Sequence, residues 1–477
     1  MDRTDATGTP IKPGKSSQKT SLSSAILEAA LDRSGTSTKT GLRNLPAELL
    51  QEIIRRVASG SAGDTAAGLH ALMLSNRFLN ASVLNGKSVK EHYEFLQPLI
   101  GAFNALKPQL ATHEINSQML ALMGPKQRQE QVAAVLGLAD DRHKAHAIAG
   151  LGAGLAHLSE SQCEDLVTAA LGLAGDEHKA KALAGLGAGL AHLSESQQKL
   201  VTAALGLADG WDKARAIAGL GTGLAHLSES QQQKLVTAAL GLTGDEHKAK
   251  ALAGLGPGLA ALEGTLQQAL VTAALGLAIE GHKAQAIAGL GAGLVHLSES
   301  QQEALITAAL GLDGWHKAHA IVGLGAGLAA LEQSQQEALI TAALGLADER
   351  NKAEAIAGLG AGLTHLSQSQ QQALVTAALR LADDRNKAEA IAGLGAGLAH
   401  LSESQQQELV TAALGMANWR HKAQAIAGLG AGLVALDGTQ QQALVTAALG
   451  LHGRHQAQAI AGLANGYQAS RVRDYLR

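Results

Sequence analysis

The sequence predicts an all-α protein, a solenoid of about ten two-helix repeats preceded by a small helical domain. A hydrophobic segment of the type Val-Thr-Ala-Ala-Leu-Gly-Leu recurs ten times, at intervals of 34 or 35 residues. Each interval holds two stretches with apolar residues at helical spacing. Only 2% of the residues are aromatic, so the core must be aliphatic and small. One unit cannot bury its apolar face alone, and ten units therefore stack.

The repeats occupy residues 131–466, and helix spacings of 8–10 Å predict a curved array about 90 Å long with a continuous inner surface. The recurring segment begins at Val132, Val167, Val201, Val236, Val271, Ile306, Ile340, Val375, Val410 and Val445.

The first helix of each unit begins at a capping box, as at Ser159 and Gln162, where each residue satisfies a backbone amide of the other. Leu166, Val167 and Leu171 continue the helix with one apolar stripe. The helix ends at a short polar turn that differs from copy to copy.

The second helix is expected from about His178 to His192, and it contains the run Ala-Gly-Leu-Gly-Ala-Gly-Leu. Each glycine inside a helix costs about 1 kcal/mol relative to alanine, so packing must compensate. Glycines four residues apart, such as Gly150 and Gly154, leave a flat strip that a neighbouring helix can approach closely. A phosphate-binding glycine loop would need a preceding strand and different spacing. The run therefore predicts close helix packing.

Composition excludes several functional classes. The formal net charge of −3 gives no general attraction to nucleic acid or to anionic membranes. The single cysteine, Cys163, rules out an intrachain disulfide framework. No apolar run reaches the 18 residues of a membrane span, and the first twenty residues are polar. We therefore expect a soluble protein without a membrane partner.

Nearly every polar residue after Val132 is a copy, whereas catalytic sites are unique. No Cys/His, Ser/His/Asp or carboxylate constellation stands apart from the repeat. Histidine ladders recur at the positions of His143 and His157, but they lack the carboxylate or cysteine companions of a zinc site. We expect no enzyme, no cofactor and no metal.

Two neighbouring columns are informative when the copies are aligned with each other. A lysine recurs in nine copies, from Lys144 to Lys422, near the start of the second helix. Two residues later the side chain varies and drifts from basic to acidic, which predicts a charge-graded groove that orients a bound target protein. A solvated polar face is the alternative interpretation of both columns. The predicted target-binding residues are Lys181, Arg215, Lys250, Gln285, His319, Glu354 and Glu389.

The layout is similar to that of the TAL effectors of plant-pathogenic bacteria, which read DNA with helical hairpins of 33–35 residues. The paired variable residues followed by Gly-Gly-Lys-Gln are missing here, and the net charge is negative. Phosphate binding favours a basic chain. Nucleic acid is thus a secondary alternative as a partner.

Residues 1–41 hold 14 serines and threonines, a composition typical of disorder, and this leader resembles those of bacterial type III secreted effectors. Residues 42–85 contain Leu-Pro-Ala-Glu-Leu-Leu-Gln-Glu-Ile-Ile and then Leu-Ser-Asn-Arg-Phe. This segment resembles the F-box, although its connection over 58–67 is longer than usual. An amphipathic helical cap is the alternative. The resemblance implies binding to a Skp-family ubiquitin-ligase adaptor through Leu45, Pro46, Leu49, Leu50 and Ile53.

Residues 86–130 are expected to link this segment to the array through helices at 89–106 and 113–123, and residues 467–477 to form a polar C-terminal cap. An F-box followed by repeats resembles a substrate receptor of a ubiquitin ligase. We therefore expect an adaptor that is secreted by a bacterium into the host cytoplasm or nucleus, or is otherwise cytoplasmic. The alternative is a repeat scaffold or a TAL-like array without a ubiquitin-ligase role.

Overall fold

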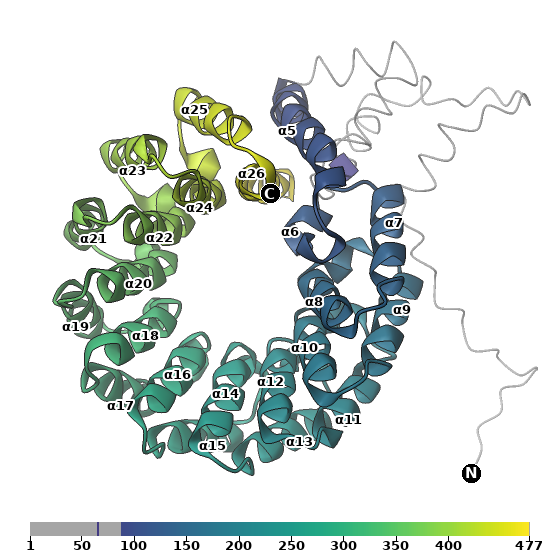
Figure 1. The fold of residues 1–477 in the computed structure, drawn as a ribbon. Helices are drawn as coiled ribbons and strands as arrows, with labels where there is room; N and C mark the ends of the chain where they lie inside the picture. The colour runs from purple at the N-terminus through teal and green to yellow at the C-terminus, as the bar shows by residue number, and fades with distance from the viewer. Residues whose placement is uncertain (1–63, 66–86, 477) are drawn as a thin grey trace, which may run out of the picture.

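The protein is a ring of paired helices, seen along its axis in Figure 1. The computed structural model describes residues 64–65 and 87–476, and this part of the chain contains helices and no strand. From α7 onward the helices alternate between an outer and an inner layer (Figure 1), and each contacts the same-layer helix of the next unit. The expected all-α solenoid is confirmed.

The outer helices begin at capping residues and the inner helices follow after a short turn. The outer layer consists of α7 (Pro125–Leu136), α9 (Glu160–Leu171), α11 (Gln197–Gly206), α13 (Glu229–Leu240), α15 (Gly264–Leu275), α17 (Glu299–Leu310), α19 (Gln333–Leu344), α21 (Gln368–Arg380), α23 (Glu403–Gly415) and α25 (Gly438–Leu449). The inner layer consists of α8 (Asp141–Leu151), α10 (Asp176–Leu186), α12 (Gly210–Gly221), α14 (Asp245–Leu255), α16 (Glu280–Gly291), α18 (Gly314–Gly325), α20 (Glu349–Leu359), α22 (Asp384–Leu394), α24 (Trp419–Leu429) and α26 (Gly453–Leu476).

Each inner helix before α26 leads back to the next outer helix through a 3₁₀ segment. These are η4 (Gly152–His157), η5 (Gly187–His192), η6 (Leu224–His226), η7 (Gly256–Ala261), η8 (Leu294–His296), η9 (Leu328–Ala330), η10 (Gly360–His365), η11 (Gly395–His400) and η12 (Gly430–Ala435). The second helix expected to reach His192 thus ends at Leu186, because the glycine-rich run tightens into 3₁₀ geometry.

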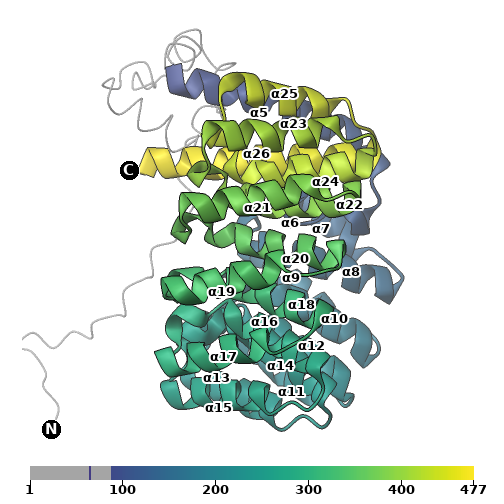
Figure 2. The same cartoon turned by 90° about the vertical axis from the view of Figure 1, so that its left-hand side faces the viewer.

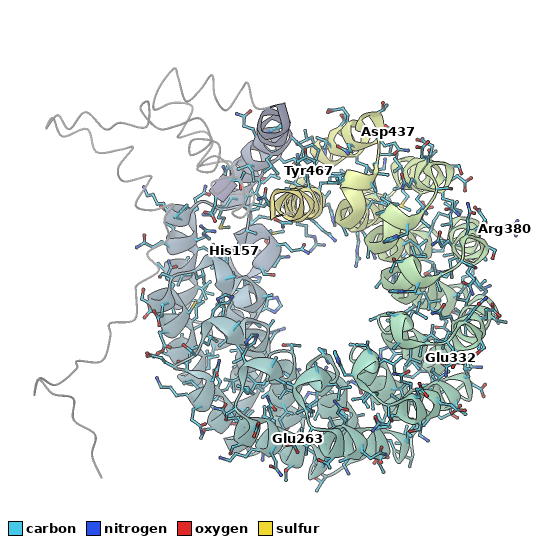
Figure 3. All side chains as sticks on the ribbon, turned by 180° about the vertical axis from the view of Figure 1, so that it is seen from behind. His157, Glu263, Glu332, Arg380, Asp437 and Tyr467 are labelled. Carbon is cyan, nitrogen blue, oxygen red and sulfur yellow. The ribbon has the colours of Figure 1, made fainter. Side chains whose placement is uncertain are left out.

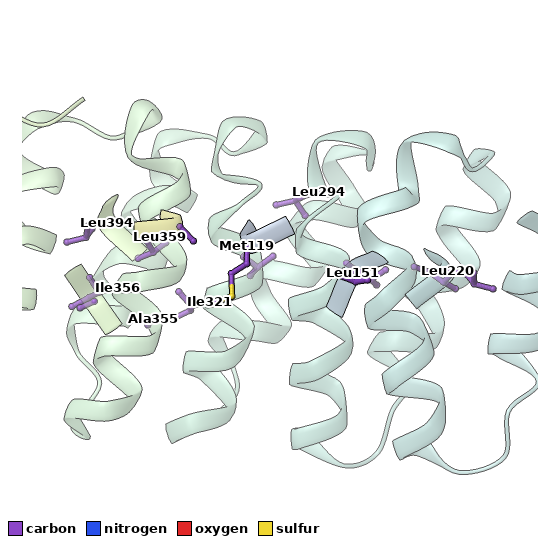
Figure 4. Packing of buried hydrophobic residues seen from close by; sticks show 14 of the residues in the cluster. Met119, Leu151, Leu220, Leu294, Ile321, Ala355, Ile356, Leu359 and Leu394 are labelled. Atoms are coloured by element: carbon purple, nitrogen blue, oxygen red, sulfur yellow. The ribbon is translucent and has the colours of Figure 1, made fainter. Parts of the chain in front are cut away.

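The predicted capping boxes form in most units, but α11 and α15 have none. In α9 the Gln162 amide donates to Ser159 Oγ at 3.3 Å, and the Ser159 amide donates to Gln162 Oε1 at 2.8 Å. The leucine, isoleucine, valine and alanine side chains between the two layers form one continuous buried cluster, part of which is drawn in Figure 4.

In six of the outer helices, α13, α15, α17, α19, α21 and α23, a glutamine ties the helix to the 3₁₀ segment before it. Gln336 donates from Nε2 to the carbonyl oxygens of Leu328 and Leu331, both at 3.0 Å. Cys163 occupies this position in α9, and its burial raises the pKa of the thiol to about 11. The same pair of hydrogen bonds is made by Gln232, Gln267, Gln302, Gln371 and Gln406. These bonds fix the turn geometry in every unit that has the glutamine.

The glycines lie where inner helices touch, so the packing interpretation of the glycine run is confirmed. A Cβ on Gly185 would lie 2.2 Å from Ala149 Cα of the preceding unit. A Cβ on Gly187 would lie 2.0 Å from the carbonyl oxygen of Gly219 in the following unit. Both neighbours are backbone atoms, which side-chain rearrangement cannot move away.

The curved array closes on itself, which the sequence analysis did not predict. α26 packs against α24 on one side and against α5 (Lys87–Leu106) and the short α6 (Ser117–Leu120) on the other. The rings of Phe95 and Tyr467 stack with centroids 3.9 Å apart, and Asn465 Nδ2 donates to the Gln118 carbonyl at 2.9 Å. Figure 2 shows α5 beside α25 and α26. We call these contacts the closure.

The chain before the repeats is less helical than expected. α5 corresponds to the predicted helix at 89–106, and the 3₁₀ turn η2 (Lys107–Gln109) follows it. The 3₁₀ turn η3 (Thr112–Glu114) and the short α6 stand where a helix was expected over 113–123. The boundary expected after residue 466 falls inside α26, where Tyr467 and Gln468 are buried.

Two residues of the F-box-like segment are described, and both contact the ring beside the closure. Arg128 of α7 forms an ion pair with Asp64, and Gln468 Nε2 donates to Thr65 Oγ1 at 3.1 Å. No helix in the described part of the chain is long and apolar enough to cross a bilayer.

Candidate functional site

The variable column forms a row on the inner side of the ring, which we call the recognition row. In α10, Ala182, Leu183 and Leu186 are fully buried between the layers, and Lys181 lies on the opposite side of the helix, half-buried. Figure 3 shows side chains of the inner helices pointing into the centre of the ring. The recognition row consists of His146, Lys181, Arg215, Lys250, Gln285, His319, Glu354, Glu389, Gln424 and Gln458.

All seven predicted target-binding residues belong to this row, one per inner helix, and adjacent members interact. His319 Nδ1 lies 3.4 Å from Glu354 Oε1 on the next helix. Burial lowers the pKa of His146, and the positive charge of Lys181 on the next helix lowers it further. The row is thus a continuous strip. The five predicted adaptor-binding residues, Leu45 to Ile53, lie outside the described residues.

A second variable row was missed in the sequence. It lies four residues before the recognition row, which is one helical turn, and so shares its helix face. We call it the first-turn row: Arg142, Glu177, Trp211, Glu246, Gly281, Trp315, Arg350, Arg385, Arg420 and Arg454. Its signal was present, because this position also differs between copies whose apolar positions are nearly fixed.

The two rows have opposite charge trends. Glu177 precedes Lys181 by one turn, whereas Arg350 precedes Glu354 and Arg385 precedes Glu389. A charge gradient inferred from the recognition row alone is therefore incomplete. The inner face is better described as two adjacent strips whose charges change in opposite directions along the chain. The arginines of the first-turn row are concentrated in the last four units.

Glu389 is the recognition-row carboxylate with a shifted pKa. Burial raises its pKa, and the negative charge of Glu354 raises it further, whereas Arg385 and Arg350 act in the opposite direction. The charged form is thus disfavoured in the folded ring relative to the unfolded chain.

We expect Glu389→Gln to raise the Tm by about 1 °C at pH 7, because it removes the cost of a charged, half-buried carboxylate. A raised folded-state pKa means that this cost is present at high pH and disappears as the pH falls below the unfolded-state pKa. The Tm difference between variant and wild type should therefore vanish toward pH 3.5. Calorimetry measures the Tm of both proteins at each pH, and Glu403→Gln, at an exposed position, is the control. A Tm gain that does not change with pH would contradict the raised pKa of Glu389.

The lysine column, from Lys144 to Lys422, does not lie on the inner face with the recognition row. Lys352 lines a groove between α19 and α21 together with Glu349, Gln372 and Arg380, and Lys213 lines the corresponding groove between α11 and α13. Arg380 lies at the outer rim in Figure 3. The lysine column and the recognition row, two residues apart, thus serve different surfaces.

Tryptophans mark the start of three inner helices. Trp315 and Trp419 are 54% and 57% exposed, while Trp211 is half-buried. The centroid of the Trp419 ring lies 5.7 Å from that of the His452 ring, in the connection between α25 and α26. An apolar contact surface is therefore available beside the first-turn row.

Among the described residues, no group of three or more His, Cys, Asp or Glu side chains is arranged to hold a metal ion. The histidine ladder reaches the ring's first elements, where the rings of His113 and His143 stack at 4.7 Å.

No protein-family model matches this chain, and no curated protein matches it. Similar solved structures include an engineered protein, with 16% identity over 71% of this chain and 98% of that chain, at a TM-score of 0.27. Kap121p matches at 10% identity over 95% of this chain and 55% of its own, with a TM-score of 0.33. Kap121p bound to Nup53p matches at 12% identity, over 91% and 53%, also at 0.33. The chain thus spans about half the length of the karyopherin chains. At these identities and TM-scores, no function is assigned from the similarity.

Proposed function

We propose that the chain is a substrate receptor without catalytic chemistry. In this proposal the inner face of the ring holds a segment of a target protein, and the F-box-like segment 42–85 docks on a Skp-family ubiquitin-ligase adaptor. The chain acts as a secreted bacterial effector inside a host cell. One observation carries the proposal: the units keep their buried apolar positions and their glycine contacts, yet differ where the inner helices face the centre.

The location of the variation supports recognition rather than stability. Most side chains of the recognition row are half-buried, and most of those of the first-turn row are exposed. Substitutions at exposed positions usually change the free energy of unfolding by less than about 0.5 kcal/mol, so folding places the least constraint on the first-turn row. A stack of units that each present a different side chain at the same register suits an extended partner, which each unit contacts in turn. The carboxylates Glu354 and Glu389 favour a protein over a phosphate backbone.

Reversing Lys181, Arg215 and Lys250 to Glu should reduce capture of target protein more than tenfold while changing the Tm by only a few degrees. Quantitative affinity mass spectrometry from host-cell extract measures capture, and retention on immobilised duplex DNA tests the alternative. The matched control reverses Lys179, Lys213 and Lys248, which lie on the same three helices and carry the same charge. Equal loss in both variants, or a selective loss of DNA retention, contradicts target binding by the recognition row.

Replacing Leu45 and Pro46 by alanine should abolish adaptor binding, because the F-box resemblance assigns both side chains to the adaptor interface. Titration of a purified Skp-family adaptor by calorimetry measures it, and circular dichroism should show unchanged helicity. Unchanged affinity of the double variant would mean that segment 42–85 is not an F-box. The test is independent of the recognition row.

A further inference from the structure

Four arginines follow one another along the first-turn row in the last quarter of the sequence. Arg350, Arg385, Arg420 and Arg454 occupy the second position of α20, α22, α24 and α26, and all four are exposed. These helices are consecutive in the inner layer (Figure 1). Packed helices lie about 8–10 Å apart, so the guanidinium groups recur at about that interval. We call these residues the arginine arc.

The arc has no carboxylate partner at contact distance. None of the ion pairs among the described residues includes any of its four members. Two of the neighbouring acids accept backbone amides: Asp383 Oδ1 accepts from the Arg385 amide at 2.8 Å, and Glu349 Oε2 accepts from the Ala382 amide at 3.1 Å. Glu354 and Glu389, one turn further along the same helix face, form no ion pair with Arg350 or Arg385. The guanidinium donors of the arc are therefore left for a ligand.

Helix stability does not account for the arc. A positive side chain in the first turn is disfavoured by the helix dipole, and the same position holds Glu177 and Glu246 in earlier units. An apolar side chain lies next to the arc, because Trp419 directly precedes Arg420 and is 57% exposed. Arginine and tryptophan are the residue types most enriched in the energetically dominant parts of protein interfaces.

We propose that the arginine arc binds an extended acidic peptide segment whose carboxylates recur at every third residue. This inference rests on the proposed function and specifies the chemistry of the target segment. Arginine pairs with carboxylates in bidentate geometry. A polyproline II segment advances about 3.1 Å per residue with three residues per turn, so every third side chain returns to the same face after about 9 Å. That interval matches the spacing of the arc, and Trp419 can pack against the intervening prolines.

A nucleic acid fits the arc less well. Each strand carries a phosphate about every 3.4 Å along a duplex, so charge also falls between the arginines. Glu354 and Glu389 lie one turn further along the same helix face and repel such a continuous polyanion. A peptide with spaced carboxylates meets an arginine at each charge and leaves the intervals neutral.

The test uses the full chain and a fluorescein-labelled peptide of four Glu-Pro-Pro repeats, followed by fluorescence anisotropy. The quadruple variant Arg350→Gln, Arg385→Gln, Arg420→Gln and Arg454→Gln should bind about 10- to 100-fold more weakly. This range corresponds to about 0.35–0.7 kcal/mol for each lost charge pair, within the values found for exposed pairs. The control variant Lys317→Gln, Lys352→Gln, Lys387→Gln and Lys422→Gln removes the same charge two residues after the first-turn row. It should retain affinity within about threefold. Trp419→Ala should weaken binding several-fold, and a Lys-Pro-Pro peptide should not bind.

The proposal is wrong if wild type does not bind the acidic peptide, or if the arginine and lysine variants lose affinity equally. It is also wrong if a labelled single-stranded oligonucleotide binds more tightly than the peptide and loses affinity in the arginine variant. Unchanged helicity and Tm of both quadruple variants separate lost binding from lost folding. Because target capture is tested with Lys181, Arg215 and Lys250, the failure of the arc leaves that test intact.

Discussion

Replacing Gly289 by alanine is expected to destabilise the ring by about 3 kcal/mol or more. A Cβ at this position would lie 2.1 Å from Ala253 Cα and 2.2 Å from the Ala253 carbonyl oxygen. Both are backbone atoms of α14, so α14 and α16 must separate to accept the methyl group. Overpacking of a rigid contact costs about 1–3 kcal/mol or more, and separation also weakens neighbouring contacts. Urea unfolding followed by circular dichroism measures the change.

Gly415→Ala is the matched control. Gly415 is the last residue of α23, and nothing lies within 4 Å of a Cβ built there. Alanine has the higher helix propensity, so this variant should be as stable as wild type or slightly more stable. Equal stability of the two variants would mean that the inner helices do not approach as closely as described.

Tyr467→Ala is expected to open the ring at its closure while the rest of the stack stays folded. Tyr467 is 3% exposed, and its ring stacks on Phe95 of α5. Truncating a buried aromatic side chain costs about 3–5 kcal/mol, and here the loss falls on a single interface between chain ends. In a Cys163→Ala background, spin labels on Gln97→Cys and Gln442→Cys report the separation of α5 and α25, and small-angle scattering reports the radius of gyration. Both quantities should increase.

Tyr467→Phe keeps the stacked ring and should leave the spin-label distance narrow and unchanged. If Tyr467→Ala gives the same distance distribution as wild type, the closure does not depend on this contact. If the alanine variant instead loses most of its helicity, the ring folds as one cooperative body rather than as a stack that opens at one place.

The repeated features were the predictable ones. The capping pair of Ser159 and Gln162 and the close approach at Gly185 rest on local rules, and their recurrence in most units leaves little ambiguity. The placement of the recognition row on one helix face follows from helical periodicity. The end of the inner helix at Leu186 was missed because a glycine-rich run can continue as an α-helix or tighten to 3₁₀ geometry at similar cost.

The closure could not be predicted because it depends on an accumulated angle. Each unit is rotated slightly relative to the last, and ten small rotations decide whether α26 meets α5 or passes it. No single residue encodes that sum. The first-turn row was overlooked for another reason: its arginines look like ordinary solvated charges until the helix face shared with Glu354 and Glu389 is known. The adaptor-binding residues, beginning at Leu45, remain predictions from the sequence.

The closure also changes where the molecule can come apart. In an open stack the terminal units are each held by one neighbour, so both ends fray first and amide protons there exchange fastest. In this ring every unit has two neighbours, and detaching one breaks two interfaces. Among the described elements, the contact of α26 with α5 and α6 joins the two ends of the array, and Asp64 and Thr65 attach beside it through Arg128 and Gln468. Transient opening is therefore concentrated beside the segment that carries the F-box resemblance. A protein bound to that segment can shift the equilibrium between the closed and the opened ring.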